Sequence, residues 1–331
     1  MAEKIFRNAL REALLEEMER DERVFLIGED IGKFGGAYRV TEGLLDRFGE
    51  MRVVDTPIAE ETIVGCAIGA AMSGLRPVVE MMTVNFSLLA YDQIVQNAAK
   101  IRYMFGGEVS VPMVVRLPGG AGHQLSSQHS HSFEVLYGMI PGLLVVAPTT
   151  PEDAKGLLKS AIRTDNPVMF MESMSLYNVR GEVPDDDYTT PIGKAAVRRE
   201  GRDLTIVGVS RQAVLALSAA QMLEEEDVDA EVIDLRSIRP IDWAPLVESV
   251  QKTSRCLIVE EGWPTYGVSA EIAAGLQERA FDYLDAPIRR MGGAEVPMPY
   301  NKELEKAAIP SAYDIVNKAL RTIGKDGRQR E

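Results

Sequence analysis

Residues 143–173 have the sequence LLVVAPTTPEDAKGLLKSAIRTDNPVMFMES, in which two short apolar runs flank one helical pattern. Thr150 can cap this helix, Pro151 suits its first position, and Asp153 lies three residues after the cap. A strand, a helix and a second strand in this order predict two parallel strands joined by a crossover helix. The segment therefore predicts an α/β fold.

The same alternation extends toward the N-terminus. Short apolar, β-rich runs occur at 24–30 (VFLIGED), 78–84 (VVEMMTV) and 111–117 (VPMVVRL), with helical stretches between them. Several such runs favour one parallel sheet covered by helices. We therefore expect the first part of the chain to be a parallel-sheet α/β domain.

A chain of 331 residues is longer than one core usually supports. Residues 181–193, GEVPDDDYTTPIG, combine glycine, proline and three aspartates with little apolar periodicity, which is typical of a linker. The α/β alternation then restarts. We predict a first domain over 1–185, a linker over 186–196, a second α/β domain over 197–324 and a polar tail over 325–331.

Composition narrows the function classes. Hydrophobic residues make up 46% and charged residues 26%, and no apolar run approaches the ~20 residues of a membrane span. The first residues lack a secretory pattern, so we expect a cytoplasmic protein without a membrane partner. The net charge of −14 opposes nucleic-acid binding. Cys66 and Cys256 lie in apolar segments, and we expect both to be reduced core residues.

Residues 55–77, DTPIAEETIVGCAIGAAMSGLRP, predict a helix that begins near Glu60. Its body is rich in glycine and alanine, which let another backbone approach closely, so we expect it to pack against a partner helix. Glu60 and Glu61 then lie where the helix dipole favours a carboxylate and burial penalises it. Either one of them has a function, or both are exposed residues of the first turn.

The three histidines, His123, His129 and His131, lie in a loop after the strand at 111–117. Loops at the carboxyl ends of parallel strands are common ligand sites, and imidazole transfers protons near neutral pH. A zinc site and a polar loop without catalytic duty are the alternatives. The chain has no GDG motif with a downstream asparagine, so we do not expect it to hold a diphosphate with magnesium.

Several stretches together resemble one known family, the β subunits of heterotetrameric, thiamine-diphosphate-dependent 2-oxo acid dehydrogenases. The similarity is collinear from about residue 4 to residue 322. It implies a pyrimidine-binding domain with a parallel sheet, followed by a transketolase C-terminal-type α/β domain. The stretches are 24–44, 55–60 (DTPIAE), 69–87, 128–130 (QHS), 141–163 and 296–305 (VPMPYNKELE).

The resemblance also implies site residues. Glu60 matches the glutamate that hydrogen-bonds the aminopyrimidine ring of thiamine diphosphate, and Phe86 matches the aromatic residue against that ring, with plain core packing as the alternative. His129 matches the histidine that assists acyl transfer to a lipoyl group, whereas His123 and His131 have no counterpart. Magnesium and the diphosphate belong to the α subunit. Some members bind potassium at positions that match Met113, Ala161, Ile162, Thr164 and Asn166.

The implied partners are an α subunit, in an α2β2 heterotetramer, and a dihydrolipoyl acyltransferase core with its lipoyl domain. Residues 37–44 and 296–305 are more similar to enzymes that act on pyruvate than to branched-chain enzymes. The expected activity is oxidative decarboxylation of pyruvate, a small 2-oxo acid, with acetyl transfer to the lipoyl group. The alternatives are a branched-chain 2-oxo acid or acetoin dehydrogenase, and, in a different class, a scaffold subunit without catalytic duty.

Overall fold

The computed structural model describes residues 1–325. The chain divides into two compact units, each with its own core. The first comprises 1–119 and 136–192, and the second comprises 120–135 and the residues from 193 onward. The histidine segment 120–135 thus groups with the second unit, although it follows a strand of the first.

The first unit is built on a parallel sheet, as the alternating pattern predicts. Its strands are paired in the order β6-β7-β5-β4-β2-β3, and every pairing is parallel. Nearly all of their residues are buried, because helices cover such a sheet. The strands are β2 (Val24–Gly28), β3 (Val53–Asp55), β4 (Arg76–Glu80), β5 (Val114–Gly119), β6 (Leu144–Val146) and β7 (Val168–Ser173).

Three longer helices belong to this unit: α1 (Phe6–Arg20), α3 (Glu60–Met72) and α6 (Pro151–Arg163). Helix α6 is capped as predicted, since the Thr150 side chain accepts a hydrogen bond from the Asp153 amide at 3.1 Å. The shorter elements are α2 (Leu44–Phe48), η1 (Phe86–Ala90), η2 (Gln93–Ala98), α4 (Ile101–Met104) and η3 (Met174–Leu176), and α5 (Glu134–Gly138) spans the division between the units.

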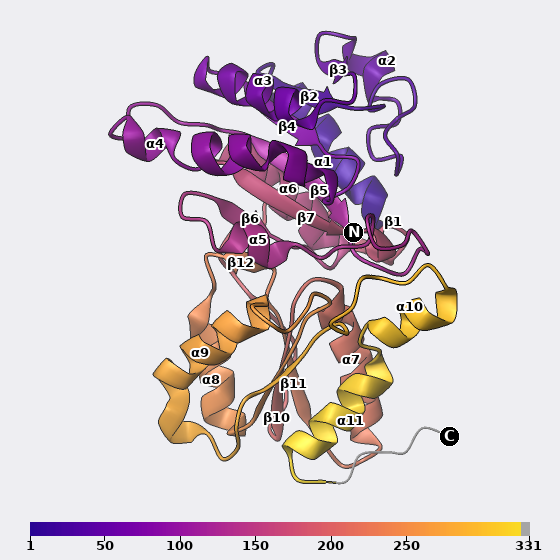
Figure 1. Ribbon diagram of the computed structural model, residues 1–331, viewed down its shortest axis with the longest axis vertical. Coiled ribbons are helices and arrows are strands. Elements are labelled where there is room, and N and C mark those ends of the chain that lie inside the picture. The colour runs from indigo at the N-terminus through magenta and orange to yellow at the C-terminus, as the bar shows by residue number, and fades with distance from the viewer. Residues whose placement is uncertain (326–331) are drawn as a thin grey trace. The chain divides into compact units, whose positions relative to one another are not determined.

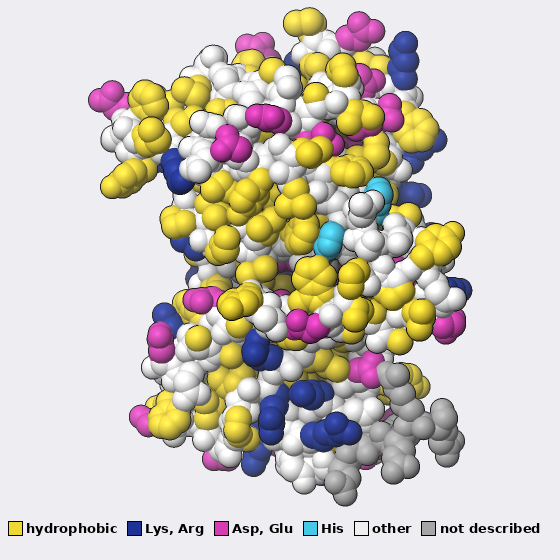
Figure 2. All heavy atoms as spheres, viewed as in Figure 1, with side chains coloured by type: hydrophobic (Ala, Val, Ile, Leu, Met, Phe, Trp, Pro, Cys, Tyr) yellow, Lys and Arg dark blue, Asp and Glu magenta, His cyan; other side chains and the backbone are white. Residues whose placement is uncertain are grey.

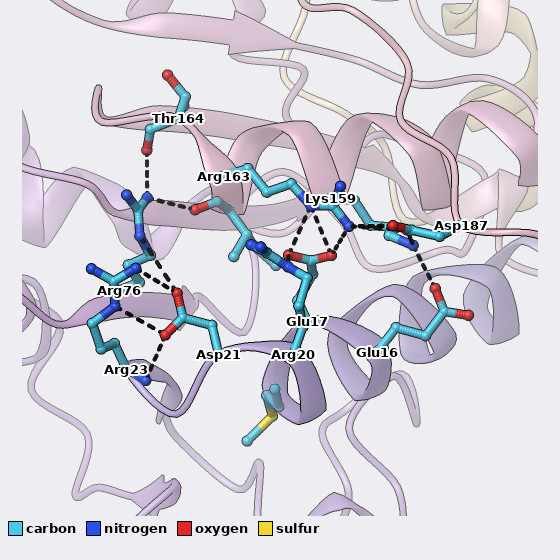
Figure 3. Close-up of polar contacts among 12 residues, drawn as sticks. Glu16, Glu17, Arg20, Asp21, Arg23, Arg76, Lys159, Arg163, Thr164 and Asp187 are labelled. Atoms are coloured by element: carbon cyan, nitrogen blue, oxygen red, sulfur yellow. Dashed lines mark hydrogen bonds and ion pairs between the residues drawn. The ribbon is translucent and has the colours of Figure 1, made fainter.

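Charged side chains join α1 to α6 (Figure 3). Lys159 is buried and its Nζ lies 2.6 Å from Glu16, while it also pairs with Asp187. Arg163 lies 2.6 Å from the buried Glu17 and 3.0 Å from Asp187. Burial opposes ionisation of Glu16, but hydrogen bonds from Lys155 and Lys159 outweigh it and lower its pKa. Most anions in this cluster thus have more than one cation.

A second ionic group lies inside the sheet. Arg116 of β5 is 1% exposed, and its guanidinium bonds Glu172 of β7 at 2.7 and 2.8 Å and Glu80 of β4. The Tyr177 hydroxyl donates to Glu172 at 2.7 Å. Burial raises the pKa of Glu80 despite the guanidinium. This one cation therefore balances two buried carboxyl groups.

The second unit has a five-stranded sheet in the order β14-β13-β10-β11-β9, parallel except for β9. Helices α8 and α9 cover one side of it, and α7 and α11 cover the other (Figure 1). The strands of this sheet are β9 (Ala196–Arg199), β10 (Leu204–Gly208), β11 (Ala230–Asp234), β13 (Cys256–Val259) and β14 (Arg289–Met291), and β12 (Ser237–Arg239) of the same unit lies outside it. Its helices are α7 (Arg211–Glu224), α8 (Trp243–Thr253), α9 (Val268–Ala280), η4 (Phe281–Tyr283), α10 (Lys302–Ala308) and α11 (Ala312–Thr322).

Strands flank the predicted linker, 186–196. Arg180–Val183, before it, forms β8, which pairs antiparallel with β1 (Ala2–Ile5), and Ala196, its last residue, begins β9. The predicted tail, 325–331, lies outside the described residues except for Lys325. Among residues 1–325, no helix is both long and apolar enough to cross a membrane.

The expectation for the cysteines is correct for Cys256 and wrong for Cys66. Cys256 is buried in β13, whereas Cys66 is exposed on α3. Helix α3 buries Ile63, Val64, Ala67, Ile68 and Ala71 on one side. The other side exposes Thr62, Cys66, Gly69 and Ser73. The apolar neighbours of Cys66 suggested burial, but the small residues of α3 lie on its exposed face.

Candidate functional site

The carboxyl edge of the first sheet collects acidic and hydroxyl side chains. Gly28 at the end of β2 pairs with Asp55 of β3 and with Glu80 of β4. The residues that follow these strands therefore leave the sheet at one edge, where open α/β sheets place ligands. They include Glu29 and Asp30 after β2, Thr56 and Glu60 after β3, and Thr83 and Phe86 after β4.

Glu60 is the first residue of α3 and is only 7% exposed. Within residues 1–325 its carboxyl group has neither a hydrogen bond nor an ion pair. Burial raises the pKa of the nearby Glu29, and the charges of Asp30 and Glu60 raise it further. These carboxyl groups therefore form an acidic site suited to a ligand that donates a hydrogen bond.

Two hydroxyl groups at this edge also lack a partner. The buried Oγ1 atoms of Thr56 and Thr83 have no hydrogen bond within the described residues. A buried polar atom without a partner costs about 1–3 kcal/mol, so a native structure seldom keeps several without reason. Together with Glu60, these atoms fit a polar group bound from outside the chain.

Phe86 begins η1, which packs against α3. Its ring is half-buried, between the buried Asn85 and Ser87. The structure thus brings the elements of Glu60 and Phe86 together.

The histidines lie in the segment 120–135 of the second unit, and histidine side chains are visible at its surface in Figure 2. His129 is half-buried, and its amide donates to the Ser126 carbonyl at 3.4 Å. His131 stacks on Phe133 at 4.4 Å and contacts the edge of Trp263 at 5.6 Å. Burial lowers the pKa of His131. Among residues 1–325, no three His, Cys, Asp or Glu side chains are grouped to hold a metal.

Three of the five carbonyl groups predicted for potassium already accept hydrogen bonds. Arg76 Nη1 donates to the carbonyls of Ile162 at 2.9 Å and Thr164 at 3.0 Å. The Met113 carbonyl accepts from the Val168 amide at 2.9 Å. A carbonyl oxygen has two lone pairs and can serve a second partner, but the guanidinium charge opposes a cation beside it. Ala161 lies in the last turn of α6, and Asn166 lies beyond the C-cap residue Thr164.

Reasoning from the sequence did not single out Glu29, Asp30, Thr56 or Thr83. A usable signal was present, because each follows a strand of the parallel sheet and such residues gather at its carboxyl edge. Their shared environment depends on strand order, which the separate apolar runs do not specify.

Comparison with known proteins supports this architecture. Residues 3–180 match the family model "Transketolase, pyrimidine binding domain", and residues 193–315 match "Transketolase, C-terminal domain". Among solved structures, the chain is similar to a split-gene transketolase, described as an inactive β4 tetramer, with a TM-score of 0.79 and 23% identity, covering 98% of this chain and 99% of that one. This likeness shows the fold.

Curated relatives share far more of the sequence. The chain is 50% identical to the pyruvate dehydrogenase E1 component subunit β of Rickettsia bellii, over 94% of this chain and 96% of that protein. It is also 50% identical to the mitochondrial subunit of the same name from Dictyostelium discoideum, over 97% of this chain and 91% of that protein. The mitochondrial pyruvate dehydrogenase E1 component subunit β-1 from Arabidopsis thaliana is 50% identical as well, over 95% of this chain and 88% of that protein.

Proposed function

Because this chain belongs to the family of pyruvate dehydrogenase E1 component β subunits, we propose that Glu60, Phe86 and His129 carry its share of the catalytic site. The chain is the β subunit of a thiamine-diphosphate-dependent enzyme that decarboxylates pyruvate. The relatives favour this reading over branched-chain, acetoin and scaffold functions. Pyruvate, the lipoyl disulfide and a proton give carbon dioxide and an S-acetyl-dihydrolipoyl group.

The observation that carries the proposal is the buried residue Glu60, whose carboxyl group has no hydrogen bond or ion pair within residues 1–325. The residues fit the aminopyrimidine end of thiamine diphosphate, which supplies the electron sink for decarboxylation when it is bound. Glu60 would accept a hydrogen bond from the ring nitrogen and hold a proton there. Phe86 would give the ring an apolar face, and the Thr83 hydroxyl is available for a polar contact.

His129 would act in the second half of the reaction. Its imidazole lies on a surface segment, and an imidazole can donate or accept a proton near neutral pH. Acyl transfer to a lipoyl group delivers a proton to a sulfur atom, which is the step that a general acid assists. We assign His129 to this step, and His123 and His131 to none.

The proposed main partner is an α subunit in an α2β2 assembly, with the diphosphate and magnesium on the α side. The exposed face of α3, Thr62, Cys66, Gly69 and Ser73, supports a close helix contact because its side chains are small. A β carbon added at Gly69 would meet nothing within 4 Å in this chain. Gly69→Leu should therefore leave the chain folded while it weakens copurification with the α subunit. The second proposed partner is the dihydrolipoyl acyltransferase core.

The test uses this chain copurified with its α subunit. Acceptor-linked decarboxylation of pyruvate, 3-methyl-2-oxobutanoate and acetoin should show strong preference for pyruvate. Glu60→Gln should lower that turnover by a factor of ~100 or more while assembly persists. Glu61→Gln, an exposed neighbour on the same turn, is the matched control and should stay within twofold. An active Glu60→Gln assembly would refute the assigned role.

Potassium and location stay predictions. Potassium at the carbonyls of Met113, Ala161, Ile162, Thr164 and Asn166 should appear in metal analysis of the purified assembly at about one ion per chain. Its replacement by sodium should lower the melting temperature, and no change would argue that Arg76 alone serves these carbonyls. Cell fractionation tests the predicted cytoplasmic location.

A further inference from the structure

Two buried glutamates hold the segment 120–135 within the second unit. Glu305 of α10 is 1% exposed, and it accepts hydrogen bonds from the Gly122 amide at 2.9 Å, the Gln124 amide at 3.2 Å and Gln124 Nε2 at 3.2 Å. A carboxylate is acceptor-only, so three donors satisfy most of its capacity. Glu305 therefore fixes the first part of the segment by charge-assisted bonds.

Glu261, which follows β13, holds the base of the same segment. Its Oε1 accepts from the Ala121 amide at 2.7 Å and from the Ser132 hydroxyl at 3.2 Å. Arg211 Nη1 lies 3.4 Å from its other oxygen and balances the charge. One carboxyl group thus joins the two ends of the segment, eleven positions apart in sequence, to one point of the second unit.

The backbone between these anchors is strained. Gln124 and Ser126 have φ values of 52° and 67°, which side chains other than glycine adopt at a cost of about 1–2 kcal/mol each. The Ser126 carbonyl accepts from the His129 amide at 3.4 Å and from the Ser130 hydroxyl at 2.8 Å. The strained turn therefore leads directly to the histidine, and something outside the turn must stabilise it.

We propose that Glu305 is a positioning residue for His129: its carboxylate holds Gly122 and Gln124, and through the turn at Ser126 it fixes where the imidazole lies. This inference rests on the proposed function of His129. Glu305 touches no reacting group, so it should influence the acyl-transfer half of the reaction and leave decarboxylation to Glu60.

The experiment compares two partial reactions of the α-containing assembly. Glu305→Gln should lower acetylation of a lipoyl domain at least tenfold in kcat/KM, while pyruvate decarboxylation with an artificial electron acceptor stays within twofold. Glu303→Gln lies on the same helix but is exposed, and within residues 1–325 its carboxyl group accepts only from Lys306, at 3.5 Å, so it should change neither rate. Gln124→Asn tolerates the left-handed backbone but shortens the amide, and should cause a smaller loss in acetylation alone.

Amide hydrogen exchange gives a second readout that does not depend on activity. Glu305→Gln should speed exchange in the peptide that contains Gly122 and Gln124 and leave β10 and β11 protected. An equal loss of both partial reactions, or unchanged acetylation while His129→Gln is impaired, would overturn the inference. If His129→Gln acetylates normally, the function proposed for His129 fails instead. Unchanged hydrogen exchange in Glu305→Gln would show that Glu305 does not hold the segment 120–135.

Discussion

Glu60 and Glu305 are both buried glutamates near the start of a helix, yet their surroundings differ. Glu305 accepts hydrogen bonds from three donors of the segment 120–135. Glu60 has none within the described residues and lies beside Glu29, whose pKa is raised. One carboxylate is satisfied by its own chain and the other is not. Burial alone thus does not distinguish a structural acid from one that is proposed to bind a ligand, whereas their hydrogen-bond partners differ.

The largest loss of stability is expected where two buried carboxyl groups depend on one cation. Arg116→Met would leave Glu80 and Glu172 buried without it, and we expect a loss of about 3–5 kcal/mol in the free energy of unfolding. Urea unfolding measures this loss. Arg180→Met is the control, because Arg180 and Glu3 form an exposed pair, and it should cost less than ~1 kcal/mol. Equal losses would contradict the view that the partners decide the cost.

Substitution of Lys159 should cost less stability, because other cations pair with the same carboxylates. Lys159 is as buried as Arg116, but Lys155 also pairs with Glu16 and Arg163 also pairs with Asp187 (Figure 3). Lys159→Met therefore leaves no acid without a cation, and we expect a loss of about 2 kcal/mol in the same urea assay. A loss as large as that of Arg116→Met would show that the remaining cations do not compensate.

The pH dependence of stability tests the raised pKa of Glu134, whose carboxyl group has acidic rather than basic neighbours. Burial and the charges of Glu261 and Glu260 raise its pKa from 4.5 to about 7. The folded chain therefore binds more protons than the unfolded chain between these values, so stability should fall as pH rises from about 4.5 to about 7. Glu134→Gln should remove about 1–2 kcal/mol of this fall, measured by melting at pH 5 and pH 8. Identical pH profiles would refute the raised pKa.

The smallest expected change is a gain in stability rather than a loss. Glu60→Gln removes a like charge beside Glu29 but also a favourable charge at the start of α3. We expect a net gain of about 0.5 kcal/mol in stability, in an assembly that has lost its activity. Thermal melting of the parent and the variant measures it. A clear loss of stability would mean that Glu60 has a partner in the folded chain after all.

Much of the fold could be predicted from local sequence. The cap at Thr150, the start of α3 at Glu60 and the alternating strands and helices all depend on residues a few positions apart. Cys66 shows the limit of this reasoning, because its apolar neighbours do not reveal which side of the helix faces outward.

The site could be predicted only in part. The family resemblance indicated Glu60, Phe86 and His129, but not the contacts that distinguish them. Glu305 lies 183 positions from Gly122, and Glu261 lies 140 positions from Ala121. Contacts between residues so far apart form only in the folded chain, and the neighbouring sequence of either residue does not predict them.

The unequal exposure of the cysteines makes the chain easy to label at one position. Cys66 is accessible, whereas burial raises the pKa of Cys256 to about 12 and keeps its thiol protonated. A maleimide dye at mild alkaline pH should therefore attach to the outer face of α3, less than two turns from Glu60. Because this face is the proposed close contact with the α subunit, the label should block association with that subunit, as Gly69→Leu should.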